Sequence, residues 1–139
     1  MNNNIRFLDH PSDIGIQAHG ASRAEAFASA AAALVSLLLD PSTVDTTERR
    51  SIAVTASDEE QLLVRWLSEI LFLYDGNRFV CRNIDVSTCT ATAIEATVSG
   101  EPFDPRKHTA RTDIKAVTYH QLAIWHDDAG WGVRVYVDV

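Results

Sequence analysis

Residues 57–77 carry the pattern that most constrains the fold. Apolar side chains recur there at the three- and four-residue spacing that places them on one face of an α-helix. They are Leu63, Trp66, Leu67, Ile70, Leu71 and Tyr74. Ser57 and Glu60 have the spacing of a capping box, and Asp75-Gly76-Asn77 is a typical helix end. A helix with one apolar face must bury it, so the rest of the chain has to supply a covering surface.

A second helix is predicted after residue 22. Ser22 and Glu25 form another capping box, and the alanines behind it favour helix and let a neighbouring element pack closely. Asp40-Pro41 ends the helix, because proline cannot continue it. The polar stretch 40–50 is expected to be a mobile connection. The apolar stripe of this helix consists of Phe27, Ala30, Ala31, Leu34 and Leu38.

The remaining segments have the composition of β-strands. Residues 14–19 alternate apolar and polar side chains, and residues 79–86 and 90–98 are rich in Thr, Val and Ile. Further strands are predicted at 5–8, 51–56, 114–126 and 131–137. This order predicts an α+β fold: a single compact domain over residues 1–139, in which an antiparallel or mixed β-sheet packs with two α-helices.

The composition narrows the class of function. The chain has 139 residues and a formal net charge of −7, from 12 basic and 19 acidic residues. Such an acidic protein is a poor candidate for holding nucleic acid through its phosphates, because that needs clustered Lys and Arg. An acidic surface instead attracts cations or a basic partner protein. Cys81 and Cys89 are too few for a disulfide scaffold and are expected to be reduced.

No segment predicts export, membrane insertion or a known catalytic motif. The first residues lack the basic and apolar regions of a signal peptide, and the longest apolar stretch, 30–39, is too short to span a bilayer. A cytoplasmic, soluble protein is therefore expected. The chain has no GxSxG, P-loop, GxGxxG or HExxH, which counts against a free-standing enzyme.

Two places concentrate acidic side chains. The loop between the first two strands carries Asp9, His10 and Asp13, which can bind a metal or transfer protons but are also ordinary turn formers. At the other end of the chain, Asp138 stands one residue before the terminal carboxylate of Val139. Two carboxylates so close repel each other unless a hard cation such as Ca²⁺ neutralises them. A frayed, solvated end is the alternative.

A hairpin closed by residues 127–130 would relate the last two strands. If that turn is the whole loop, Asp138 opposes Tyr119 on the polar face. Without a bulge, Lys115 lies on the same face two pleats further along. These three side chains could line one polar surface, although a solvated sheet face explains the pattern equally well.

The histidines outside the first loop give weaker indications of a functional role. His120 falls on the apolar face of the hairpin beside Leu122, which predicts a core residue. His19 stands at a strand end and is expected to be structural. His108 lies in a polar loop and is expected to be exposed.

Several segments, in order along nearly the whole chain, resemble the archease family. Residues 10–16, His-Pro-Ser-Asp-Ile-Gly-Ile, resemble the H-T-A-D-I-G-I opening of archeases, with Pro-Ser in place of the usual Thr-Ala. Residues 62–72 look like their LL-x-x-W-L-x-E-L-L segment, and residues 114–120 like their I-K-A-V-T-Y-H segment. Gly100-Glu101 and the Asp138-Val139 ending resemble their G-E segment and Asp-Ile ending.

The resemblance implies a protein cofactor rather than an enzyme. Archeases assist the RtcB-type RNA ligase of tRNA splicing and RNA repair, which uses GTP and a divalent metal. They promote guanylylation of a ligase histidine and so allow repeated turnover. By matching positions, a divalent-metal site would consist of Asp13, Asp138 and the terminal carboxylate of Val139, with Ca²⁺ expected and Mn²⁺ or Mg²⁺ as alternatives. Three further side chains would face the partner or a phosphate: His10, Lys115 and Tyr119.

Two other functions fit the same residues. A general metal-binding chaperone or adaptor for nucleic-acid-processing enzymes needs only the acidic site and a protein-binding surface. A small phosphoesterase would use the two aspartates and a metal, but the missing catalytic motif counts against it.

Overall fold

The computed structural model describes residues 4–10 and 12–139. Its strands form two antiparallel sheets. The four-stranded sheet has the order β1 (Ile5–His10), β2 (Asp13–Gly20), β7 (Gly130–Asp138) and β6 (Ala116–Asp127). The three-stranded sheet has the order β3 (Glu48–Thr55), β5 (Ala93–Pro102) and β4 (Phe79–Cys89). The predicted α+β class with two helices is confirmed, but the strands divide over two sheets instead of forming one.

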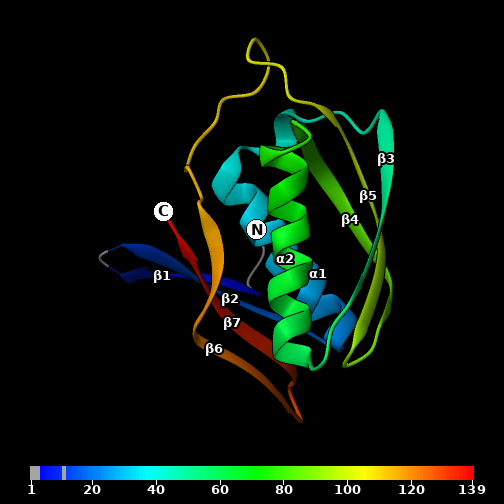
Figure 1. Cartoon of the computed structure of the whole chain (residues 1–139), viewed down its shortest axis with the longest axis vertical. Coiled ribbons are helices and arrows are strands. Elements are labelled where there is room, and N and C mark those ends of the chain that lie inside the picture. Colours follow the sequence, from blue (N-terminus) through cyan, green and yellow to red (C-terminus); the bar gives the residue numbers. More distant parts are fainter. Residues whose placement is uncertain (1–3, 11) are drawn as a thin grey trace.

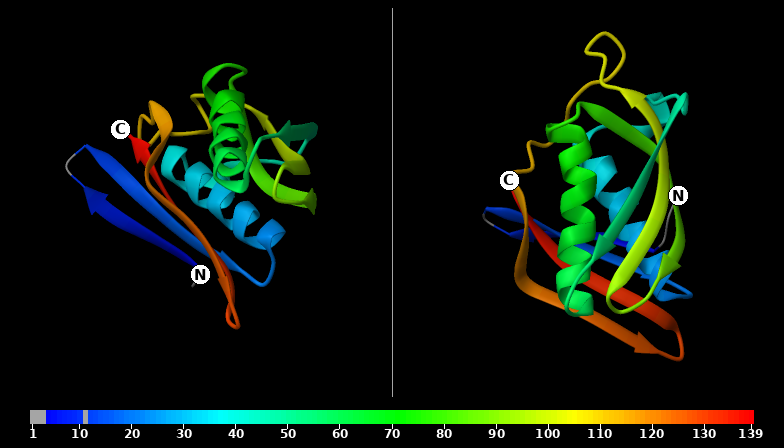
Figure 2. Two further views of the ribbon diagram at one scale, coloured as in Figure 1. Left: turned by 60° about the horizontal axis from the view of Figure 1, so that its bottom comes forward. Right: turned by 45° about the vertical axis from the view of Figure 1, so that its right-hand side comes forward.

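Helix α1 (Arg23–Leu38) explains this division. It contacts β2 on one side and β4 on the other, so it lies between the sheets, with α2 (Glu59–Asp75) beside it (Figures 1 and 2). A helix covered from two sides must be apolar on more than one face. Ala26, Ala33 and Val35 are accordingly buried in addition to the predicted stripe. The small alanine side chains allow both sheets to approach closely.

The apolar stripe predicted for α2 joins the two helices. Trp66 is completely buried, and its indole Nε1 donates a hydrogen bond of 2.9 Å to the carbonyl oxygen of Phe27 in α1. A buried indole N–H needs such a partner, because leaving it unpaired would cost about 1–3 kcal/mol. This hydrogen bond fixes the two helices against each other within the core.

Both helices begin with a capping side chain, but in α2 the cap lies one residue after the predicted position. Ser22 caps α1, its hydroxyl accepting from the amide of Glu25 at 3.2 Å. In α2, however, the cap is Asp58, which accepts from the amide of Gln61 at 2.8 Å, while the Gln61 side chain accepts from the amide of Ser57 at 2.8 Å. The predicted Ser57–Glu60 pair was wrong by one residue, because Asp is as good an N-cap as Ser.

Between the helices, the connecting segment is shorter than predicted. Residues Pro41–Thr43 form a 3₁₀ turn (η1), capped by the Asp40 carboxylate, which accepts from the amide of Ser42 at 3.0 Å. Strand β3 begins at Glu48, so the predicted connection 40–50 already contains the first residues of a strand.

The β6–β7 hairpin follows the predicted register only near its turn. His126 lies opposite Trp131, and the pairing continues regularly to Ala123. The register then shifts between Ala123 and Thr118. Past this bulge Asp138 lies opposite Ala116, so the predicted pairing of Asp138 with Tyr119 was wrong.

The bulge is held open by backbone geometry and one arginine. Gln121 adopts a φ of 50°, in the left-handed region, and its carbonyl oxygen accepts a 3.0 Å hydrogen bond from Nε of Arg134. Tyr119 is 56% exposed as a result. His120 is exposed as well, with its ring edge-on to Tyr136 at 5.7 Å, so its prediction as a core residue was wrong.

Within the described ranges, no helix has the length and apolar character needed to cross a membrane.

Candidate functional site

The structure pairs the two predicted aspartates. Strands β2 and β7 run antiparallel, and their register places Asp13 at the start of β2 directly opposite Asp138 at the end of β7. Directly opposed residues of an antiparallel pair project from the same face. Asp13 is only 8% exposed, whereas Asp138 is exposed. Residues 125 positions apart in sequence thus form one acidic pair, called here the carboxylate pair.

The alternation of the strands decides which face carries the carboxylate pair. The pair Ile16 and Val135, three residues along the two strands, is completely buried in the core that contains α1. The carboxylate pair has the opposite parity and therefore lies on the outer face of the sheet, away from the helices. Its position explains how two acidic side chains can be opposed without entering the apolar core.

The outer face is shaped by a close aromatic contact. A Cβ atom on Gly15 would lie 2.8 Å from Cε2 of Tyr136, so the tyrosine ring occupies the space that a side chain would take. Gly15 pairs with Tyr136 in the same register, two residues from the carboxylate pair. This glycine allows the ring to lie flat on the sheet, and Tyr136 is only 6% exposed.

Backbone hydrogen bonds join three chain segments at this end of the sheet. The amide of Val139 donates to the carbonyl oxygen of Ser12 at 3.3 Å, and the amide of Lys115 donates to that of Asp138 at 2.8 Å. The C-terminal end of the chain and the start of β6 lie side by side (Figures 1 and 2). The last residues are therefore tied to both neighbouring strands.

The structure thus brings together most of the predicted site residues. Asp13, Asp138 and Val139 are adjacent, and Lys115 is attached to them through the backbone. The exposed Lys115 ammonium has no ion-pair partner among the described residues. Tyr119 stands apart in the bulge, contrary to its predicted place opposite Asp138. The side chain of His10, like that of Asp9, lies outside the described residues, although the His10 backbone pairs with Asp13.

The donor chemistry of this cluster fits a hard divalent cation. Carboxylate oxygens are the ligands that Ca²⁺ and Mg²⁺ prefer, and a cation would relieve the repulsion between two opposed carboxylates. No group of three His, Cys, Asp or Glu side chains suited to a metal exists in the described part of the chain. The third donor predicted from the sequence, the carboxylate of Val139, belongs to the main chain and not to such a group of side chains.

A second charged cluster, missed by the sequence reasoning, lies at the end of β5 and in the loop that follows it. The Oε2 atom of Glu101 accepts from Nζ of Lys107 at 2.7 Å, from Nε2 of His108 at 2.9 Å and from the amide of Asp45 at 2.9 Å. The hydrogen bond from Lys107, followed by that from Asp45, lowers the pKa of Glu101 to about 2. Lys107 also contacts the Asp45 carboxylate at 2.6 Å.

His108 is buried inside this second cluster, so its predicted exposure was wrong. It is 2% exposed, and its Nδ1 accepts a 2.9 Å hydrogen bond from the amide of Asp104. The proton must then be on Nε2, which donates to Glu101. Both ring nitrogens are occupied and Phe103 lies 5.6 Å away, so His108 braces the loop. Only the Gly-Glu segment of the family resemblance pointed to this place in the sequence.

Comparison with known proteins identifies the family. The model of the archease protein family (MTH1598/TM1083) matches residues 6–139. The chain belongs to the archease family. It is 39% identical over 139 residues to the archease of Sulfurisphaera tokodaii, covering 97% of this chain and 98% of that protein. It is 37% identical over 137 residues to the archease of Methanosarcina barkeri, and the match covers 96% of this chain and 94% of that protein.

Solved structures agree with this archease fold. The solution structure of Methanobacterium thermoautotrophicum protein 1598 has a TM-score of 0.81 and 29% identity, covering 98% of this chain and 99% of that one. A Thermotoga maritima crystal structure, described as an archease and possible chaperone, has a TM-score of 0.61 and 20% identity, covering 95% of this chain and 94% of that one. At this low identity, the Thermotoga structure shows only that the folds are similar.

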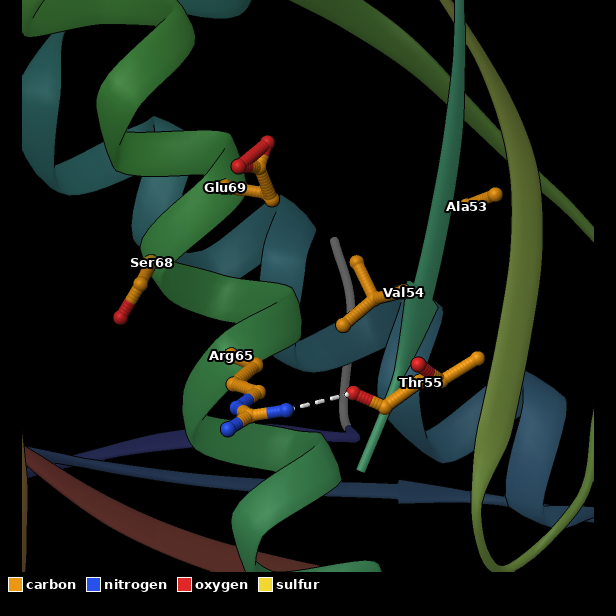
Figure 3. Close-up of a pocket in the computed structure, with 6 residues that line it drawn as sticks. All are labelled: Ala53, Val54, Thr55, Arg65, Ser68 and Glu69. Carbon is orange, nitrogen blue, oxygen red and sulfur yellow. Dashed lines mark hydrogen bonds between the residues drawn. The ribbon is translucent and has the colours of Figure 1, made fainter.

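Two hollows on this archease lie beside α2. One, of about 420 Å³, lies between β3 and α2 and is bridged by a 2.9 Å hydrogen bond from Nη1 of Arg65 to the carbonyl oxygen of Thr55 (Figure 3). None of its lining residues belongs to either charged cluster. The other, of about 280 Å³, lies between the C-terminal half of α2 and the start of β6, and its lining includes Lys115.

Proposed function

We propose that this archease is a non-catalytic cofactor of an RtcB-type RNA ligase in tRNA splicing and RNA repair. It would promote guanylylation of the ligase histidine and so permit multiple turnover. One observation supports this most: Asp13 and Asp138 are opposed at one end of a sheet, next to an exposed lysine. Family membership supports the same function, and the proposed place of action is the cytoplasm.

The carboxylate pair would hold the divalent cation together with the terminal carboxylate of Val139. Ca²⁺ suits a set of carboxylate oxygens, with Mn²⁺ or Mg²⁺ as alternatives. When bound, such an ion supplies positive charge that stabilises negative charge on phosphate oxygens.

Lys115 would contribute a positioned cation of this chain's own. The Lys115 amide donates to the carbonyl oxygen of Asp138 at 2.8 Å, and the Lys115 ammonium forms no ion pair with the described residues, so it is available to a phosphate. The acidic chain would leave GTP and RNA to the ligase, which explains how a protein of net charge −7 can act in RNA joining. The complex must be transient, because a bound activator would block RNA.

A guanylylation assay tests this proposal. Limiting cognate ligase is incubated with labelled GTP and Mn²⁺, with and without the archease, and ligase-bound GMP is followed over time. We expect at least a tenfold faster reaction with the archease and a strong loss for Lys115→Ala. Arg106→Ala removes an equally charged but 92% exposed side chain and should behave like the unchanged protein.

The result that contradicts the proposal is an unchanged guanylylation rate with saturating archease. If the archease instead protected several unrelated nucleic-acid enzymes from aggregation in a metal-dependent manner, the chaperone or adaptor function would replace the ligase function.

A further inference from the structure

Phe72 is an exposed aromatic side chain whose ring packs against Gly76. It lies on α2, is 54% exposed, and its ring occupies the space beside the Cα atom of Gly76, where an added Cβ would lie 2.5 Å from ring atom Cε1. Large aromatic side chains are typical anchors for protein partners, because they bury much apolar area and have few rotatable bonds to order on binding.

The ring borders a groove rather than a flat surface. The groove of about 280 Å³ has a mostly apolar lining in which Leu71 and Val117 lie with Phe72. Its volume is below the roughly 300–1,000 Å³ of small-molecule sites, so it fits a side chain of a partner better than a free ligand. Phe72 and the groove together form an apolar notch between α2 and β6.

One border of the groove is acidic. Asp75 lines it, and burial followed by the nearby Asp113 carboxylate raises the pKa of Asp75, an effect that Arg78 partly offsets. Two carboxylates that repel each other beside an apolar notch complement a basic side chain next to a large apolar one.

The groove is continuous with the carboxylate pair. Lys115 and Ala116 line the groove, Ala116 lies opposite Asp138 in the β6–β7 register, and the Lys115 amide is bonded to Asp138. The carboxylate pair lies on the outer face of the sheet and the groove on its helix side, so a partner that extends around the start of β6 contacts both.

We infer that the groove between α2 and β6 is the docking site for the ligase, and that it receives a large apolar side chain flanked by a basic one. This inference rests on the proposed function, because it takes the ligase as the partner that meets the carboxylate pair. Phe72 supplies the apolar contact, and Asp75 with Asp113 supplies the charge. Docking here would place the carboxylate pair and Lys115 at the ligase surface together.

The test measures binding of the purified archease to the immobilised cognate ligase, with Ca²⁺ titration of each variant as a second readout. Phe72→Ala should weaken ligase binding at least tenfold and leave Ca²⁺ affinity unchanged. Phe7→Ala is the matched control, because Phe7 is 47% exposed on β1, outside the groove lining, and should bind within twofold of the unchanged protein.

A second pair of variants tests the charge. Asp75→Asn combined with Asp113→Asn should weaken binding about fivefold, while Asp128→Asn, in the exposed turn before β7, should have no effect. If Phe72→Ala and Phe7→Ala both bind the ligase as tightly as the unchanged protein and still activate it, the groove is not the docking site, while the proposed function stands. An unchanged archease that neither binds nor activates the ligase overturns the proposed function itself.

Discussion

The two charged clusters of this archease are built in opposite ways. Around Glu101, one carboxylate oxygen accepts from an ammonium, an imidazole and an amide, so the negative charge is neutralised inside the protein. At the carboxylate pair, the register instead opposes Asp13 to Asp138, so two like charges face each other. The Glu101 cluster braces a loop through its own hydrogen bonds, whereas two opposed carboxylates have the charge and the donor atoms to bind a cation.

The position of each cluster agrees with this difference. The Glu101 cluster joins the loop after β5 to residues before β3, and removing it would loosen both. The carboxylate pair lies at a sheet end on the outer face, outside the apolar core. We therefore expect substitutions in the first cluster to reduce stability and substitutions in the second to reduce cation binding.

The largest expected effect concerns cation binding. Asp13→Asn combined with Asp138→Asn should lower Ca²⁺ affinity more than about 100-fold, because each substitution removes a charged oxygen donor. Isothermal titration calorimetry measures it, with Asp128→Asn as a control of equal charge change per site. Undiminished Ca²⁺ affinity in the double variant would show that the carboxylate pair is not the cation site.

The second effect concerns the Glu101 cluster. Glu101→Gln keeps the shape but weakens three charge-assisted hydrogen bonds, so the free energy of unfolding should fall by about 2 kcal/mol. Urea denaturation measures the change. Asp138→Asn, in the other cluster, should change the same free energy by less than about 0.5 kcal/mol. Equal losses in both variants would remove the distinction between the clusters.

A third, smaller effect is expected at the last residue. Adding residues after Val139 turns its carboxylate into an amide, a weaker and uncharged donor, so Ca²⁺ affinity should fall about tenfold. Calorimetry of the extended chain measures this, and Val139→Ala without extension should retain full affinity, since only the main-chain carboxylate is proposed to bind. Unchanged affinity in the extended chain would exclude that donor.

The smallest effect is the acid dependence of stability. Because the pKa of Glu101 is lowered from 4.5 to about 2, its contribution is complete above pH 4.5 and is lost as the pH falls toward 2. The stability difference between the unchanged protein and Glu101→Gln should therefore shrink between about pH 5 and about pH 3. Urea midpoints at both values measure it, and a constant difference would contradict the lowered pKa.

Local patterns predicted the helices because helices depend on short-range signals. The stripe around Trp66 and the caps at Ser22 and near Asp58 involve residues within four positions of each other. The division into two sheets was not predictable in this way, because it depends on α1 being covered from both sides, which only the alanine content hints at.

The geometry of the candidate site could not be predicted from local sequence patterns either. The family resemblance pointed to Asp13 and Asp138, but their opposition follows from the β2–β7 register, which no local pattern encodes. Tyr119 was placed wrongly because the bulge before Ala123 has no clear sequence signal. His108 was placed wrongly because its burial depends on Glu101, several residues away across the loop.

The most direct test of the account is multiple-turnover RNA ligation with limiting cognate ligase, GTP and Mn²⁺. We expect the archease to raise the number of turnovers per ligase at least tenfold, and Asp13→Ala and Asp138→Ala each to abolish the gain while remaining folded. If both variants support turnover as well as the unchanged protein, the carboxylate pair is not the functional centre of this archease.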